Sequence, residues 1–235
     1  IGIWMLKRGR AAKMAEMIKG IADRDKAGRS YYTSNGYTYE LHPDYGRFPD
    51  CFGLTMYSGG CCDKEDNLFL STRDVDHPIM MLDPEGNYVT DFGKGLFKET
   101  HTLCVTPDDT LLCVDVAMHV LREISKDGEL IRDIGTPGVP SDSGFDPDIW
   151  RKRQRMGKYV PTDVSFDKGW SFFMGVGTIK RAAPPFNKPT GVAFAPSGDL
   201  FVSDGYGNAA IHRFTRDGKL VRTWGGPGDE PGRFV

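Results

Sequence analysis

The sequence predicts an all-β fold built from β-propeller blades, and three observations lead to this prediction. One pattern of short apolar runs occurs three times, in residues 67–93, 101–135 and 189–225. In the two later copies an Asp-Gly pair separates apolar runs, which is a strong signal for a tight hairpin. The composition agrees, because 29 Gly and 15 Pro among 235 residues suit many short strands joined by turns.

The two later copies show their expected elements in the same order. A short strand meets a proline turn, a second strand ends in Val-Asp or Ser-Asp, a third leads into the Asp-Gly pair, and a fourth closes on Gly. The expected first strands are 103–105 and 192–194, the third strands 120–124 and 211–214, and the closing glycines Gly135 and Gly225. Four short strands in about 40 residues are typical of one propeller blade. The earliest copy closes in the same way at Gly93 and is expected to begin at about Cys51.

We divide the chain into an N-terminal helical or irregular segment, residues 1–45, and a partial propeller, residues 46–235. Apolar residues with helical spacing predict a short basic amphipathic helix over residues 10–24. They are Met14, Met17, Ile18, Ile21 and Ala22. We expect this helix to pack on the propeller or to fray, in preference to a role at a membrane surface.

Residues 136–185 interrupt the repeat. They are rich in Pro, Gly and charge, and then contain the string PTDVSFDKGWSFFMG. This string could begin a degenerate blade, but a long insertion between blades is favoured because no Asp-Gly hairpin follows. The chain starts at Ile1, and Val235 falls partway into a repeat. We therefore expect a fragment that holds an incomplete set of roughly three to four blades.

Charge and hydropathy restrict the partners. The formal net charge of -2 gives no argument for nucleic acid or acidic lipid. No apolar run approaches the roughly 18 residues that a membrane span needs. No signal segment is recognisable either, so the sequence leaves the localisation open.

The cysteines do not identify a compartment. Cys61 and Cys62 are adjacent, and the C-x-x-C spacing of a zinc site does not occur. Cys104 and Cys113 flank the turn at residues 107–110 and are expected to lie opposite each other across a hairpin. Two small buried residues are favoured there over a strained disulfide.

Three strings carry a resemblance to a known family. They are SDGYGN at residues 203–208, DVAMH at 115–119 and GPGDEPGRF at 226–234. The sequence resembles the NHL repeats of peptidyl-α-hydroxyglycine α-amidating lyases and their bacterial relatives. The resemblance runs from about Cys51 to Val235, is weak across residues 136–185, and does not extend over the first 45 residues or so.

The resemblance implies a six-bladed propeller whose channel holds a zinc ion with three His ligands and a structural calcium ion. Such lyases split a C-terminal α-hydroxyglycine into a peptide amide and glyoxylate. The matching residues are His101 as a zinc ligand, the carbonyl group of Leu103 as a calcium ligand, Tyr206 as the catalytic tyrosine and Arg73 as the catalytic arginine. A second calcium carbonyl falls at Gly60.

The sequence also departs from the family pattern. The other two zinc ligands are expected beyond this chain. Animal lyases tie the loop of the catalytic tyrosine with a disulfide, and the paired positions here are Asn187 and Gly207. The strand end around Arg73 is one residue longer than usual, which puts the roles of Arg73 and His77 in doubt.

Each candidate also has a structural interpretation. His101 could line the channel without a metal, Arg73 could pair with Asp74 or Asp76, and Tyr206 could pack between blades. His119 and His212 are expected on third strands, away from the channel, in structural roles.

Three functions follow from these alternatives. The first is a zinc-dependent lyase that acts on a small peptide or a peptide-like substrate. The second is a non-catalytic NHL scaffold that binds a protein or peptide across the propeller face. The third, a lactonase-type hydrolase with calcium in the channel, ranks last because the inner strands lack the carboxylate and Asn ligands it needs.

Overall fold

The computed structural model describes residues 23–24, 29–42, 45–49, 55–157 and 167–234. The helix expected over residues 10–24 lies outside these residues except for Asp23–Arg24, which form the short strand β1. Among the described residues, no helix is long and apolar enough to cross a membrane.

The described chain is dominated by three four-stranded antiparallel sheets, in which the strands follow chain order. Blade 1 consists of β4 (Tyr57–Cys62), β5 (Leu68–Thr72), β6 (Ile79–Leu82) and β7 (Tyr88–Phe92). Blade 2 consists of β8 (Thr100–Val105), β9 (Leu111–Asp115), β10 (Val120–Ile124) and β11 (Leu130–Ile134). Blade 3 consists of β12 (Gly191–Phe194), β13 (Leu200–Asp204), β14 (Ala210–Phe214) and β15 (Leu220–Gly225). The prediction of an all-β propeller fold is confirmed.

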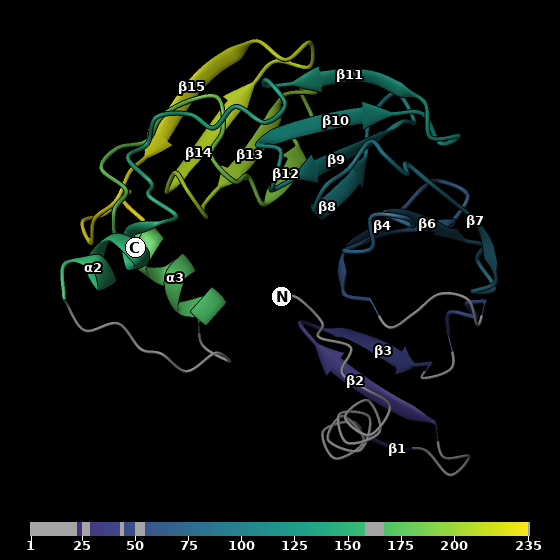
Figure 1. The fold of residues 1–235 in the computed structure, drawn as a ribbon. Coiled ribbons are helices and arrows are strands. Elements are labelled where there is room, and N and C mark those ends of the chain that lie inside the picture. Colours follow the sequence, from purple (N-terminus) through teal and green to yellow (C-terminus); the bar gives the residue numbers. More distant parts are fainter. Residues whose placement is uncertain (1–22, 25–28, 43–44, 50–54, 158–166, 235) are drawn as a thin grey trace.

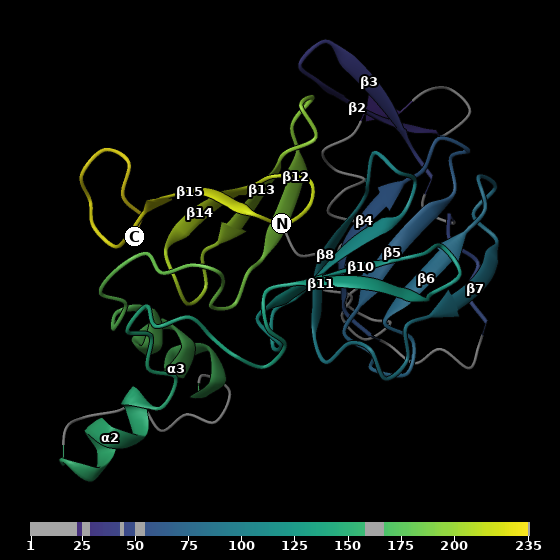
Figure 2. The same cartoon turned by 90° about the horizontal axis from the view of Figure 1, so that it is seen from above.

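The blades stand side by side along an arc, as Figure 1 shows, with β4, β8 and β12 on its concave side. These innermost strands approach closely at glycine. A Cβ atom on Gly59 of β4 would lie 2.9 Å from Thr102 Cα of β8, so only glycine fits there. In the view from above in Figure 2, blade 2 overlies blade 1 and blade 3 stands beside them.

The hydrophobic core lies between blades. One buried cluster joins Phe69 and Ile79 of blade 1 to Leu111 and Ile124 of blade 2. The second joins blade 2 to blade 3; its members are Leu112, Val114, Leu121, Ile134, Phe186, Leu200, Val202 and Phe214. Each blade therefore buries both of its faces only where it has a neighbour on each side.

The expected pairing of the two hairpin cysteines is wrong by one residue. The hairpin closes between Val105 and Leu111, and this register sets Cys104 opposite Leu112 and Leu103 opposite Cys113. Successive side chains of a strand point to opposite faces, so the two cysteines lie on opposite faces of blade 2. Both thiols are free.

The fourth strand of each blade ends at a glycine with positive φ, and a later phenylalanine packs against it. The φ angles are +87° at Gly93, +97° at Gly135 and +108° at Gly225. An added Cβ would lie 2.9 Å from Phe97, 3.0 Å from Phe186 and 2.5 Å from Phe234, respectively. The glycine thus turns the chain and leaves room for the ring that closes the blade.

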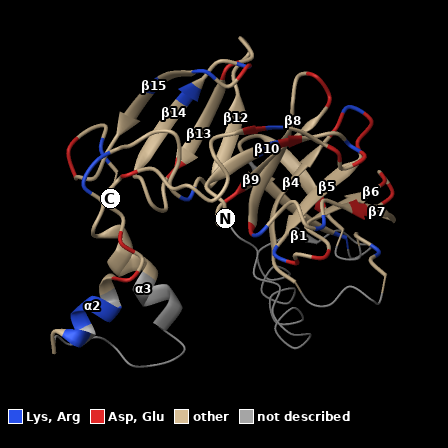
Figure 3. Cartoon of the chain, turned by 45° about the horizontal axis from the view of Figure 1, so that its top comes forward, with Lys and Arg blue, Asp and Glu red and all other residues tan. Residues whose placement is uncertain are grey.

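Residues 136–185 connect the closing glycine of blade 2, Gly135, to the phenylalanine that packs against it, Phe186. Their described part holds α2 (Ile149–Arg155) and α3 (Asp167–Val176) and no strand. Basic residues gather on the last turn of α2, as Figure 3 shows. In blades 1 and 3 only a few residues separate the closing glycine from its phenylalanine. In blade 2 this connection is much longer and contains two helices.

The segment before blade 1 differs from the expected helical or irregular structure. Its described part is a hairpin of β2 (Ser30–Ser34) and β3 (Tyr37–Leu41). The turn residues Asn35 and Gly36 have φ angles of +51° and +82°. Asn-Gly with positive φ at both positions is the preferred two-residue hairpin turn, so the signal was present in the sequence.

Ion pairs between turns reinforce the packing of the blades. Lys126 and Arg216 both stand immediately before an Asp-Gly pair, and each reaches the preceding blade. Lys126 lies 2.9 Å from Asp63, and Arg216 lies 2.6 Å from Asp108 and 2.5 Å from Glu123. Figure 3 shows acidic and basic residues gathered on these turns.

Glu123 is the central acceptor between blades 2 and 3. Its side chain is 4% exposed, and it accepts hydrogen bonds from Arg216, Thr110 and Arg132. Burial alone would raise the pKa of Glu123, but these hydrogen bonds outweigh burial and lower it to about 2.

We expect Arg216→Met to lower the free energy of unfolding by about 2 kcal/mol at pH 7, because it removes charged hydrogen bonds to a buried carboxylate. The pKa of Glu123 falls on folding, from 4.5 to about 2, so the stabilisation is complete above pH 4.5 and is lost as the pH falls towards 2. Urea unfolding should therefore show the two proteins converging as the pH is lowered. Arg213→Met is the control, because Arg213 pairs with Asp199 inside its own blade. An equal loss in both variants, unchanged by pH, would contradict the prediction.

Candidate functional site

The predicted site residues come from three blades but gather at one end of them. In an antiparallel blade the start of the first strand and the end of the second lie at the same end. Arg73 directly follows β5, His101 is the second residue of β8, and Tyr206 lies two residues beyond β13. Each blade thus brings one of these residues to the same face of the partial propeller.

His101 and Tyr206 are in direct contact across blades 2 and 3. His101 Nε2 and Tyr206 Oη are 3.1 Å apart, which is a hydrogen bond in which either group could be the donor. The rings meet edge to face with centroids 5.2 Å apart. The tyrosine is 38% exposed, so a ligand can still reach it.

A buried carboxylate, that of Asp204, holds the loop that carries Tyr206. Asp204 is fully buried and accepts hydrogen bonds from the backbone of Asn187 and the side chain of Asn208, both at 2.7 Å. A Cβ atom on Gly207 would lie 2.5 Å from Asn187 Oδ1. The two positions where the resemblance places a disulfide are therefore in contact here, as a glycine against an asparagine.

Arg73 pairs with a carboxylate that the sequence analysis did not single out. Its guanidinium forms an ion pair with Glu99 of blade 2 and not with Asp74 or Asp76. Asp76 pairs with Lys94 at 2.9 Å. Burial, followed by the positive charge of Arg73, lowers the pKa of His101, so the imidazole is neutral at pH 7.

The fourth predicted residue, Leu103, lies further along β8 than His101. Its side chain is 3% exposed and packs between blades 1 and 2. Because β8 is the inner edge of blade 2, half of its carbonyl groups have no partner within the sheet and face the concave side. Gly60 occupies the corresponding inner strand of blade 1, opposite Leu70.

The other histidines have structural partners. His119 lies in the turn before β10, one residue short of the expected third strand, and its Nδ1 accepts a hydrogen bond from Lys188 N at 3.0 Å. His212 lies on β14, fully buried, with its Nε2 3.3 Å from Asp204. His77 lies 3.0 Å from Asp91. None of the three approaches His101 in an interaction that the described residues show.

Among the described residues, one side chain of the candidate site, that of His101, is placed to act as a zinc ligand. His101 Nδ1 is buried and has no hydrogen bond of good geometry, although the backbone of Thr190 lies close, so this nitrogen is available to a metal. No group of three or more His, Cys, Asp or Glu suited to a metal occurs in the described part of the chain. His101 therefore fits as one ligand of a site that needs others.

Two contacts of the site were missed by sequence reasoning. Phe172 of α3 packs edge-on against Tyr206 with ring centroids 4.9 Å apart. Nothing in the irregular segment 136–185 could have indicated that contact. Glu99 gave a weak signal, as a charged residue directly before an inner strand.

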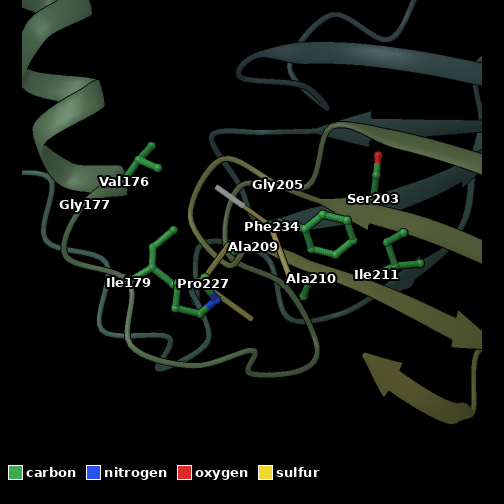
Figure 4. A pocket seen from close by; sticks show the side chains of 11 residues that line it. Val176, Gly177, Ile179, Ser203, Gly205, Ala209, Ala210, Ile211, Pro227 and Phe234 are labelled. Atoms are coloured by element: carbon green, nitrogen blue, oxygen red, sulfur yellow. The ribbon is translucent and has the colours of Figure 1, made fainter. Parts of the chain in front are cut away.

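An apolar cavity of about 430 Å³ adjoins the tyrosine loop, since Gly205 of that loop lines it, as Figure 4 shows. Its lining includes Val176, Ile179, Ser203, Gly205, Ile211 and Phe234. Ser203 and Ile211 are paired in blade 3 as Val114 and Leu121 are in blade 2. Val114 and Leu121 are covered by blade 3, so the cavity lies where a further blade would pack.

We expect Arg73→Met to raise the pKa of His101, because the substitution removes a positive charge that disfavours the imidazolium ion. The measurement is an NMR titration of the His101 ring in metal-free protein. Arg213→Met is the matched control, since Arg213 lies in the ion pair with Asp199. A His101 pKa that stays unchanged or falls in Arg73→Met would show that Arg73 does not act on the imidazole.

Comparison with known proteins agrees with the fold. The NHL repeat model matches residues 186–214, which run from Phe186 to the end of β14. Over 149 residues, 63% of this chain, the sequence is 32% identical to peptidyl-alpha-hydroxyglycine alpha-amidating lyase 1 of Drosophila melanogaster. Over 165 residues, 66% of this chain, it is 28% identical to peptidyl-glycine alpha-amidating monooxygenase of Mus musculus. The alignments cover 20% of the first protein and 13% of the second.

Solved structures give weaker likenesses. Virginiamycin B lyase from Staphylococcus aureus superposes with a TM-score of 0.46 at 13% identity, covering 86% of this chain and 54% of that one. A nidogen/laminin complex gives a TM-score of 0.48 at 11% identity, covering 83% and 56%. These two likenesses carry no weight for function. The chain thus holds a segment that matches the NHL repeat, and its sequence is similar to that of the peptidyl-α-hydroxyglycine α-amidating lyases.

Proposed function

We propose that the complete protein is a lyase that cleaves the C–N bond of a peptidyl-α-hydroxyglycine and releases a peptide amide and glyoxylate. The observation that carries the proposal is the contact between His101 and Tyr206, with Arg73 close enough to lower the pKa of His101. These are the three side chains that the resemblance selected, and they come from three different blades. The amidating relatives support the same reaction class.

Tyr206 is proposed as the base. As a phenolate, its Oη accepts the proton of the substrate hydroxyl, and the electrons of that O–H bond form the C=O of glyoxylate. The C–N bond breaks, and its electron pair stays on nitrogen, which takes up a proton to complete the peptide amide. The hydrogen bond to His101 and the edge-on contact with Phe172 hold the tyrosine ring in place for this step.

Arg73 is proposed to bind the carboxylate end of the substrate. A guanidinium group holds a carboxylate through two parallel hydrogen bonds, which fixes the orientation of the neighbouring carbon. The backbone of Arg73 is itself anchored, because its N–H donates to Met56 O at 2.9 Å. The substrate would therefore lie across the ends of blades 1 to 3, with its hydroxyl at Tyr206.

His101 is proposed to hold zinc through an imidazole nitrogen, together with ligands from elsewhere in the complete protein. Zinc, when bound, would act as a Lewis acid and lower the pKa of the hydroxyl group. The neutral state of His101 at pH 7 suits this role, because only a neutral imidazole binds a metal. The carbonyl of Leu103, on the free edge of β8, is proposed to contribute to a structural calcium site.

The contact of His101 with the partly exposed Tyr206, with Arg73 near enough to act on the imidazole, favours chemistry over a purely structural role. We therefore favour the lyase, with a small peptide as its partner.

We expect Tyr206→Phe in the complete protein to lower kcat by a factor of about 10² to 10⁴, with zinc content and fold unchanged, because the variant lacks only the group that accepts the proton. His101→Ala should lose both zinc and activity. Elemental analysis gives the zinc content, and release of glyoxylate from an α-hydroxyglycine peptide gives the rate. His77→Gln is the control, because His77, in the loop after β5, pairs with Asp91 of the outermost strand β7. Full activity in Tyr206→Phe would show that Tyr206 is not the base.

A further inference from the structure

Arg73 of the candidate site forms an ion pair with Glu99. The ion pair joins the end of β5 in blade 1 to the residue before β8 in blade 2. The arginine side chain is 18% exposed and the glutamate side chain 45% exposed. The arginine is thus largely buried, and its partner is about half exposed.

The position of Glu99 is set by the backbone and not by chance surface contact. Its N–H donates to Asp115 Oδ1 at 3.2 Å, and its carbonyl oxygen accepts a hydrogen bond from Val116 N at 3.0 Å. Asp115 is fully buried. The glutamate is therefore presented to Arg73 by a rigid segment, two residues before His101.

The guanidinium still has binding capacity. Arginine has five N–H donors, and Arg73 Nε is buried without a hydrogen-bond partner among the described residues. A buried donor without a partner is costly, and a bidentate carboxylate would satisfy it. Glu99 engages Nη1 only, so it holds the guanidinium incompletely.

We propose that Glu99 is a built-in counter-ion that occupies Arg73 until the carboxylate end of the substrate displaces it. Glu99 is then a specificity-determining residue. In the free protein the carboxylate of Glu99 compensates the positive charge of Arg73. When Glu99 is displaced, only a ligand with its own carboxylate compensates that charge. This inference rests on the proposed function only in assigning Arg73 to the substrate carboxylate.

Displacement has a measurable consequence for affinity. In the wild-type protein a carboxylate ligand exchanges one ion pair for another, so part of its binding free energy is spent on releasing Glu99. Glu99→Gln keeps the shape of the side chain but removes its charge. The arginine is then left without a counter-ion, and an anionic ligand binds without competition.

The experiment measures binding by calorimetry to the complete, zinc-loaded protein. The two probes are an N-acetylated dipeptide that ends in glycine and the same dipeptide with a C-terminal amide. Neither carries the α-hydroxyl group, so neither is cleaved. We expect Glu99→Gln to lower the Kd of the carboxylate probe about tenfold and to change that of the amide probe by less than about twofold. Arg73→Gln should abolish the preference for the carboxylate in either background.

Turnover gives a second measurement. With an α-hydroxyglycine peptide, Glu99→Gln should lower KM and leave kcat within about twofold, because the displaced group acts on binding alone. A purely structural ion pair would instead lower stability or kcat and leave the ratio of the two Kd values unchanged. Glu99→Ala is the second variant, in case the amide of Gln bonds to Arg73. Glu129→Gln, at an exposed turn between β10 and β11, is the matched control.

The outcomes separate this inference from the proposed function. Unchanged or weaker binding of the carboxylate probe in both Glu99 variants overturns the counter-ion role, even if the wild-type protein cleaves its substrate. If the Glu99 variants bind the carboxylate probe more tightly but the wild-type protein releases no glyoxylate, the counter-ion role is supported and the proposed reaction is ruled out.

Discussion

The buried aspartate at the end of the second strand is the interaction on which the rest of the site depends. Asp115 accepts hydrogen bonds from four backbone N–H groups: those of Lys98, Glu99, Ala117 and Met118. It thereby fixes both the entry into β8, which carries His101, and the turn after β9. Asp204 has the same place in blade 3 and secures the loop of Tyr206. A carboxylate that is fully buried is stable only with such donors, so the strand end and the loop support each other.

Much of this arrangement could be predicted from the sequence because it repeats. The Val-Asp and Ser-Asp pairs, the Asp-Gly turns and the closing glycines mark each blade locally, within the reach of one hairpin. The contact between His101 and Tyr206 is different, since it joins residues from separate blades. Periodicity alone does not set the angle between blades, and only the family resemblance selected that pair. Leu103 could be placed on an inner strand in the same way, while its role as a calcium ligand stays a prediction.

The parts that sequence reasoning missed have physical causes. Glu99 acquires its partner only when blade 1 is packed against blade 2, so no local pattern reveals the pair. Phe172 reaches Tyr206 from a helix in a segment without repeat or clear periodicity. The cysteine pairing was wrong because one residue more or less in a turn moves a side chain to the other face of the sheet. The hairpin at residues 30–41 was missed although its Asn-Gly turn was visible.

The packing of Phe186 against Gly135 bears on how a propeller can acquire new parts. The two residues are held together by the core, so the segment between them closes a loop whose ends are already in place. The entropy lost in closing a flexible loop grows only with the logarithm of its length, by about 0.6 kcal/mol for each doubling. A long segment can therefore enter at this joint at little cost to folding, and its side chains can reach the tyrosine loop, as Phe172 does. Such a joint lets a protein change what surrounds a site while the strands that build the site stay the same.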